Sequence, residues 1–169
     1  MMIIGIDPGF DRIGWSVGQA LRDNQLRLLS FGLIETKKTD TLWQRYSQID
    51  DELTALAHEY HIQEAALESL FFFKNQKTVI RVAEARGVIL SALLRAKVEI
   101  FEYSPPQIKM AVAGFGRADK KAMEKMVRLQ LHLDKILPNK SDKIIDDTYD
   151  AMAVLLTHVG ARKLKKVMS

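Results

Sequence analysis

Cysteine is absent from this chain of 169 residues, and none of its apolar stretches is long. Without cysteine the chain can form no disulfide, no thiolate site for zinc or an iron–sulfur cluster, and no thiol nucleophile. No apolar run approaches the roughly 20 residues that a membrane-spanning helix needs. The opening Met-Met-Ile-Ile-Gly-Ile-Asp also lacks the basic flank and the long apolar core of a signal peptide. These absences suit a reducing interior, so we expect a cytoplasmic protein with no membrane partner.

The composition is that of one globular domain, because 47% of the residues are hydrophobic and 27% are charged. We therefore expect a single domain over residues 1–169, with a basic tail from about residue 161. The net charge of +4 is distributed unevenly. Residues 104–169 carry 13 basic and 7 acidic side chains, whereas residues 1–103 carry 12 basic and 14 acidic ones. A basic C-terminal third is typical of proteins that bind a polyanion, and also of ordinary solvated surfaces.

The spacing of apolar residues predicts five strands and a set of helices in a mixed order. The predicted strands cover about 2–6, 13–17, 26–36, 65–67 and 98–103. The predicted helices cover about 40–60, 76–96, 107–113, 118–132 and 144–162, with a connection at 133–142. Three strands come first, and later strands alternate with helices. This order predicts an α/β fold with a five-stranded mixed sheet flanked by helices.

Four carboxylates stand out by their positions. Asp7 ends the first predicted strand and Glu68 ends the fourth. If these strands are parallel neighbours, both acids lie at one edge of the sheet, where ligands of open α/β sheets bind. In the last predicted helix, Asp147 and Asp150 extend the inward stripe formed by Ala151, Val154, Leu155 and His158. The neighbouring Asp146 projects away from that stripe. It is interpreted as a helix-start residue or as a residue that contacts the metal ligands without binding the metal itself.

Clustered carboxylates repel one another unless a cation lies between them. Oxygen ligands suit a hard divalent ion, Mg²⁺ or Mn²⁺, and two such ions can assist phosphodiester hydrolysis. Each acid also has a structural interpretation. Asp7 before Pro8-Gly9 is a common turn residue, Glu68 could pair with Lys74, and Asp147 could serve as a helix-start acid. The joint placement of the acids at two strand ends and on one buried stripe favours the metal site.

The chain resembles the RuvC-type Holliday junction resolvases in its motifs and their order. The matching motifs are Ile6-Asp7-Pro8-Gly9, Leu67-Glu68-Ser69-Leu70-Phe71 and Asp147-Thr148-Tyr149-Asp150-Ala151. The resemblance implies an RNase H-like fold and a homodimer that uses Mg²⁺ to nick two opposed strands of four-way junction DNA in recombination and repair. It also implies cooperation with a branch-migration helicase complex. The chain departs from the family pattern at Phe10, where Ser is common, and at Trp15, where Tyr is usual.

The resemblance assigns metal binding and catalysis to the four acids Asp7, Glu68, Asp147 and Asp150. Two ions per site are implied, with Mn²⁺ as a substitute for Mg²⁺. The family's active-site lysines fall on Lys109 and Lys120, although Lys121 follows directly and the second assignment can slip by one. A fixed ammonium near a phosphodiester stabilises the negative charge of the transition state. Arg117 and Lys121 are expected to contact the substrate.

Three consecutive aromatic residues, Phe71, Phe72 and Phe73, follow Glu68 and precede Lys74. Such a run usually places at least one ring in the core. Aromatic faces also stack on unpaired bases, for about 1–3 kcal/mol each. By resemblance Phe71 enters the opened centre of the junction and Lys74 lies at its rim.

Three other functions compete with this interpretation. Asp7-Pro8-Gly9 after a strand also resembles the phosphate turn of actin-like ATPases, which need a second domain and a second phosphate turn that this chain lacks. A non-enzymatic junction-binding module is the second alternative, and the retained acids argue against it. The third is an RNase H-like nuclease for other DNA or RNA, which competition between four-way and linear DNA would distinguish.

Overall fold

The computed structural model describes residues 1–21, 25–70, 76–136 and 145–168. Its five strands are β1 (Met2–Asp7), β2 (Arg12–Ala20), β3 (Leu26–Glu35), β4 (Glu64–Glu68) and β5 (Glu99–Tyr103). Its helices are α1 (Leu42–Glu59), α2 (Gln76–Arg95), α3 (Pro105–Ala113), α4 (Lys120–Gln130), α5 (Leu133–Ile136) and α6 (Asp146–Met168). In the described part of the chain, no helix is both long and apolar enough to cross a membrane.

The strands form one mixed sheet in the order β3-β2-β1-β4-β5. The hairpin partners β1–β2 and β2–β3 are antiparallel, whereas β1–β4 and β4–β5 are parallel. The expected five-stranded mixed sheet is therefore confirmed, as is the parallel pairing of the first and fourth strands. The parallel pairing brings the carboxyl ends of β1, β4 and β5 to the same edge of the sheet.

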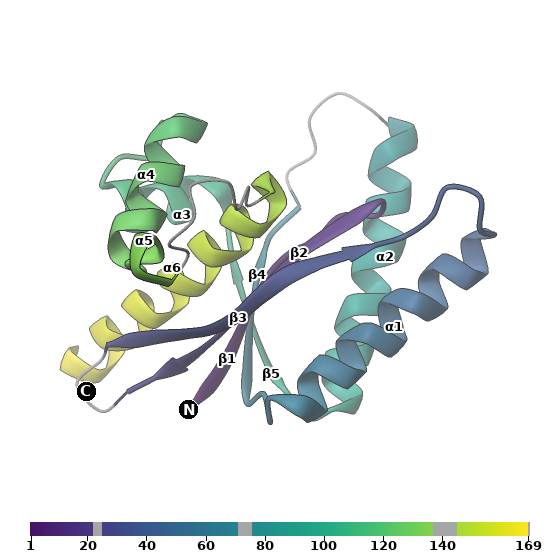
Figure 1. Cartoon of the computed structure of the whole chain (residues 1–169), viewed down its shortest axis with the longest axis horizontal. Coiled ribbons are helices and arrows are strands. Elements are labelled where there is room, and N and C mark those ends of the chain that lie inside the picture. Colours follow the sequence, from purple (N-terminus) through teal and green to yellow (C-terminus); the bar gives the residue numbers. More distant parts are fainter. Residues whose placement is uncertain (22–24, 71–75, 137–144, 169) are drawn as a thin grey trace.

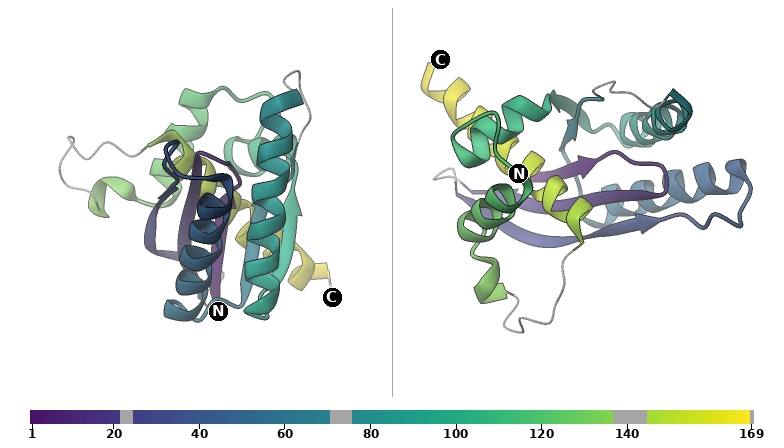
Figure 2. Two further views of the ribbon diagram at one scale, coloured as in Figure 1. Left: turned by 90° about the vertical axis from the view of Figure 1, so that its right-hand side faces the viewer. Right: turned by 90° about the horizontal axis from the view of Figure 1, so that it is seen from above.

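Helices cover both faces of the sheet, as Figures 1 and 2 show. On the face covered by α1 and α2, a buried core joins Ile4 and Ile6 of β1 to Ile49, Leu53 and Ile89 of the helices. On the other face, Met152 and Val154 of α6 pack with Ile108 of α3 and Val127 of α4. Because side chains alternate along β1, its odd-numbered residues face α6.

Local chemistry explains where α1 begins. Thr41 accepts a hydrogen bond from the backbone N–H of Gln44 at 3.3 Å, and the Gln44 side chain accepts one from the Thr41 backbone at 2.9 Å. This reciprocal capping satisfies N–H groups that have no partner within the helix. The apolar residues Ile49, Leu53 and Ala57 recur every four residues and bury one stripe against the sheet.

The strand β2 extends to Ala20, beyond its predicted end at residue 17, and three further boundaries differ from the sequence predictions. α3 begins at Pro105 and not at Gln107, because proline lacks an N–H and fits the first helical turn, where that group needs no partner. The predicted connection at 133–142 contains the short helix α5, whose four residues are too few for a periodic signal. α6 continues to Met168, so the predicted basic tail from about residue 161 is helical up to there.

Candidate active site

Two acids lie side by side at the carboxyl edge of the sheet. In the parallel pairing of β1 with β4, Ile6 is opposite Leu67, so the next residues, Asp7 and Glu68, end neighbouring strands. Both have the same side-chain parity as Gly5, whose position faces α6. The two carboxylates therefore stand at the end of the sheet on the α6 side, as the sequence predicts.

Helix α6 brings the remaining acids to this edge because glycines let it approach the sheet closely. A Cβ on Gly14 would lie 1.9 Å from the backbone oxygen of Asp147, and one on Gly5 would lie 2.4 Å from that of Ala151. Ser16 of β2 also donates a hydrogen bond of 3.0 Å to the Ala151 oxygen. The backbone of α6 thus rests directly on β1 and β2.

The predicted inward stripe of α6 is confirmed, because Ala151, Val154, Leu155 and His158 are all fully buried. The acids Asp147 and Asp150 continue this stripe in the first turns of the helix and are half-buried. Asp146, in contrast, is exposed, as its position off the stripe predicts.

An open cleft of about 400 Å³ lies between these elements. Three of the predicted acids, Asp7, Glu68 and Asp150, line it. The other lining residues are Pro8, Ser69, Leu70 and Pro105. Acids from three distant segments of the chain therefore meet at one concave surface.

The acids in this cleft perturb one another. Burial, together with the charges of Asp150, Glu68 and Asp147, raises the pKa of Asp7 from 3.8 to about 8. Burial, together with the charge of Asp150, raises the pKa of Glu68 from 4.5 to about 7. In both carboxyls, burial and the neighbouring negative charges outweigh the positive charges near the cleft. Such perturbed carboxyls are typical of functional sites.

Two lysines partly offset this charge. Burial raises the pKa of Asp150, while the positive charges of Lys120 and Lys109 act in the opposite direction. Lys109 is half-buried on α3 and also lowers the pKa of Glu68. Lys120, the first residue of α4, lies 2.7 Å from the carboxylate of Asp146 and acts on Asp7 as well. Both predicted lysines thus act electrostatically on the acidic cleft.

The neighbouring basic residues are placed differently. Lys121 lines a separate surface hollow with Lys125 and Arg128, and Arg117 is exposed in the loop before α4. This geometry favours Lys120 over Lys121 as the lysine next to the acids. The predicted DNA contacts Phe71 and Lys74 lie outside the described residues, as does the alternative pairing of Glu68 with Lys74.

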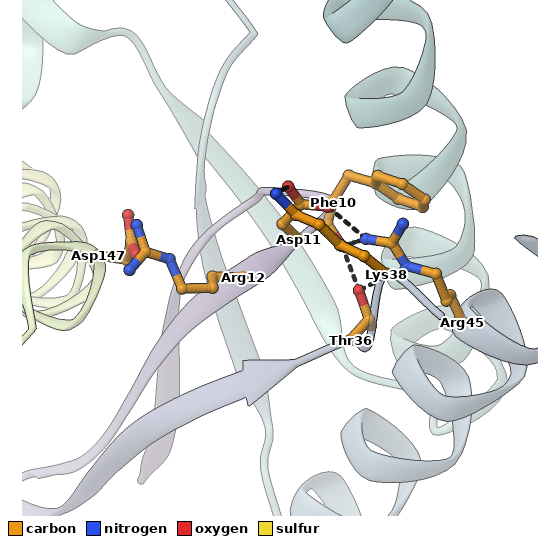
Figure 3. A network of polar contacts seen from close by, with 7 residues as sticks. All are labelled: Phe10, Asp11, Arg12, Thr36, Lys38, Arg45 and Asp147. Atoms are coloured by element: carbon orange, nitrogen blue, oxygen red, sulfur yellow. Dashed lines mark hydrogen bonds and ion pairs between the residues drawn. The ribbon is translucent and has the colours of Figure 1, made fainter. Parts of the chain in front are cut away.

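Sequence reasoning missed one charged partner of the acids. Arg12, the first residue of β2, lies with its Nε 3.0 Å from Oδ2 of Asp147, as Figure 3 shows. The only available signal is the position of Arg12 at the start of a strand that follows the Asp7 turn. That position does not reveal which helix its side chain reaches.

The acids suit a divalent cation in donor chemistry and charge. Within the described residues, no three acidic or histidine side chains converge closely enough to ligate one ion as they stand. Their donors are nevertheless carboxylate oxygens, which hard divalent ions prefer. The Oδ2 atom of Asp147 is shielded from solvent and accepts no well-aligned hydrogen bond among these residues. A cation in the cleft would supply the compensation that the raised pKa values of Asp7 and Glu68 indicate is missing.

Comparisons of the sequence and of the fold with known proteins all point to one family. The sequence model of the family described as "Crossover junction endodeoxyribonuclease RuvC" matches residues 3–158. The protein of that name from Petrotoga mobilis is 43% identical over 163 residues, which cover 96% of each chain. The Thermus thermophilus RuvC structure in complex with a Holliday junction substrate has a TM-score of 0.85 and 29% identity, covering 98% of this chain and 96% of that one.

Proposed function

Because this chain belongs to the crossover junction endodeoxyribonuclease RuvC family, we propose that it resolves four-way (Holliday) DNA junctions by paired symmetric nicks, in recombination and repair. It is a metal-dependent endodeoxyribonuclease with an RNase H-like fold. One observation of this chain carries the proposal. Carboxylates from β1, β4 and α6 share one open cleft, and their pKa values are raised by burial and by one another.

The proposed cofactor is Mg²⁺, two ions per active site, with Mn²⁺ as a substitute. Asp7, Glu68, Asp147 and Asp150 would hold them. Such ions, when bound, supply Lewis-acid stabilisation of the phosphate charge and activate a water molecule. The raised pKa values of Asp7 and Glu68, about 8 and about 7, mean that these carboxyls retain protons near neutral pH. Cation binding would therefore be coupled to proton release and would strengthen as the pH rises.

The basic residues around the cleft would bind and orient the DNA. Lys109 and Lys120 offset the charge of the acids and would steady the scissile phosphate together with the negative charge that develops on it. Arg117 and Lys121 are exposed further out and would contact the flanking backbone. By resemblance, Phe71 would stack on an unpaired base and Lys74 would line the rim.

The proposed assembly is a homodimer of single-domain chains over residues 1–169. Paired nicks on two opposed strands of a four-way junction are related by two-fold symmetry, which a two-fold enzyme matches. On α2 the side chains of Ile80 and Leu94 are 59% and 63% exposed, and no atom lies within 4 Å of a Cβ built on Gly87. This face is apolar and accessible, which supports its use between two copies. A branch-migration helicase complex and a cytoplasmic location complete the proposal.

The decisive experiment is cleavage of a synthetic four-way junction with and without Mg²⁺. We expect paired nicks at symmetric positions on two opposed strands and no cleavage in EDTA. A linear duplex of the same sequence serves as competitor and should neither be cut nor relieve junction cleavage at equal concentration. Asp7→Asn should bind the junction without cutting it. Equal cutting of linear DNA, or undiminished cutting by Asp7→Asn, would contradict the proposal.

A further inference from the structure

Arg12 connects the hairpin that carries Asp7 to the first turn of α6. Its Nε atom lies 3.0 Å from Oδ2 of Asp147. The Arg12 side chain is 50% exposed and that of Asp147 is 26% exposed, so the pair sits at the margin of the site and not in the core. Figure 3 shows the two side chains pointing toward each other from β2 and α6.

The residues before Arg12 are held in place by contacts with Arg45 of α1 and with Thr36. Arg45 of α1 is buried and pairs with Asp11, and its Nε donates a hydrogen bond of 2.8 Å to Thr36 Oγ1. Its guanidinium also lies 3.6 Å above the ring centre of Phe10. Thr36 in turn donates a hydrogen bond of 2.9 Å to the backbone oxygen of Phe10. The residues preceding Arg12 are thus fixed on α1, while Arg12 itself extends in the opposite direction, toward α6 (Figure 3).

Asp146, which precedes Asp147, has its own positively charged partner. Lys120 lies 2.7 Å from Asp146, and Arg12 lies 3.0 Å from Asp147. Each of the first two acids of α6 therefore carries one positive side chain. The two pairs differ in one respect that matters for chemistry. Asp146 is exposed, whereas Oδ2 of Asp147 is shielded from solvent.

We propose that Arg12 is an internal counter-ion of Asp147 that weakens the binding of a divalent cation at the active site. This inference rests on the function proposed above, in which Asp147 is a cation ligand. The guanidinium neutralises part of the charge of Asp147 and repels a second cation that approaches the same carboxylate. Arg12 thereby sets the cation concentration at which the site fills.

An opposite role for Arg12 is physically reasonable and predicts the opposite sign. A hydrogen-bonded partner can orient a metal ligand and increase metal affinity. In that case removal of Arg12 would weaken cation binding. The competition proposed here requires that removal strengthen it. The direction of the change therefore decides between the two roles.

The test is direct binding of Mn²⁺, followed by the electron paramagnetic resonance signal of the free ion. The full chain at pH 7.5 is compared with Arg12→Gln and with Lys38→Gln. Lys38 is a matched control because it belongs to the same polar network, pairs with Asp11 at 3.6 Å and is 82% exposed. Half-exposed ion pairs contribute up to about 1 kcal/mol, which corresponds to an apparent Kd about two- to fivefold lower for Arg12→Gln. Lys38→Gln should bind as the parent chain does.

Thermal unfolding provides a second readout. Without divalent ions, Arg12→Gln should unfold at a lower temperature than the parent chain, because Asp147 loses its partner. Saturating Mn²⁺ should raise its unfolding temperature by more than that of the parent. If Arg12 had a purely structural role, Arg12→Gln would unfold at a lower temperature both with and without Mn²⁺, and its Mn²⁺ affinity would be unchanged. Arg12→Lys keeps the charge and should bind Mn²⁺ nearly as the parent chain does, which provides a measurement if Arg12→Gln folds poorly.

Failure of this inference differs from failure of the proposed function. If the parent chain binds Mn²⁺ and Arg12→Gln binds it equally well or more weakly, the competition by Arg12 is refuted while the nuclease function stands. If the parent chain, Arg12→Gln and Arg12→Lys all bind no Mn²⁺, the cation site itself is refuted.

Discussion

Replacing Asp7 by asparagine should stabilise the folded chain at pH 8 in the absence of divalent ions. Burial is the largest cause that raises the pKa of Asp7 from 3.8 to about 8, followed by the charges of Asp150, Glu68 and Asp147. The unfolded chain has an ordinary Asp7 and ionises it near pH 4. Between about pH 4 and 8 the folded chain therefore binds more protons than the unfolded chain. Under this condition the free energy of unfolding falls as the pH rises.

The size of the effect follows from the pKa change. Full conversion at about 1.4 kcal/mol per pKa unit gives roughly 5–6 kcal/mol for Asp7 at high pH. The carboxylate lines an open cleft, so water screens part of this penalty. We therefore expect Asp7→Asn to be more stable than the parent chain by about 2–3 kcal/mol at pH 8. At pH 4.5 the folded parent holds a neutral Asp7, and the difference should nearly vanish.

The assay is equilibrium unfolding in urea with EDTA at both pH values, at one fixed protein concentration because the chain is proposed to dimerise. Asp51→Asn, an exposed carboxylate on α1, is the control and should change little at either pH. Added Mg²⁺ should stabilise the parent chain, more at pH 8 than at pH 6, and should stabilise Asp7→Asn much less. The reasoning is refuted if Asp7→Asn is equally or less stable than the parent at pH 8.

Two further predictions concern the elements that surround the cleft. Gly14→Ala should displace the start of α6, because its Cβ would lie 1.9 Å from the backbone oxygen of Asp147. We expect a loss of about 1–3 kcal/mol of stability, as for other overpacked sites, and weaker Mn²⁺ binding, whereas Gly160→Ala, whose Cβ would meet no atom within 4 Å, should spare both. Lys120→Ala should reduce junction cleavage by about 10²-fold or more with little effect on binding, because a charge that stabilises the transition state is removed. Lys121→Ala should mainly weaken binding, most visibly at higher salt, and equal losses of cleavage from both lysine variants would contradict the assignment.

The fold was largely predictable because its strands and helices carry clear periodic signals. The stripe of α6 predicts a helix and its buried face, and the short apolar run of β1 predicts a strand that is buried on both faces. The errors lie where local rules compete. Pro105 and Pro106 end β5 and also open α3, so the same residues serve as a stop and as a start. The four residues of α5 fold because Leu133 is buried against α4, which is a tertiary effect that no local pattern encodes.

The positions of the acids and of Lys109 and Lys120 in the candidate site were predictable, whereas Arg12, the charged partner of Asp147, was not. Parallel pairing of β1 with β4 brings Asp7 and Glu68 to one edge. The phase of α6 predicts that Asp147 and Asp150 face inward, and close packing of α6 on the sheet brings them to that edge. The pairing of Arg12 with Asp147 depends on how closely α6 packs on β2. Gly14 permits this close packing, but a glycine in the sequence does not predict it.

The uncompensated charge of the acids lowers the stability of the folded chain and leaves these carboxylates available to bind a cation. Glu64, at the opposite end of β4, is a contrasting case. Burial alone would raise its pKa, but hydrogen bonds from Arg162 and His158 outweigh burial, so the pKa of Glu64 is lowered. At Asp7 and Glu68 the opposite holds, because burial and the neighbouring acids outweigh the lysines and the pKa values stay high. The two ends of β4 therefore differ, because Glu64 is paired with positive side chains while Glu68 is only partly compensated. The unsatisfied pair therefore marks the position where a cation from solution would complete the structure, and Arg12 determines how readily it does so.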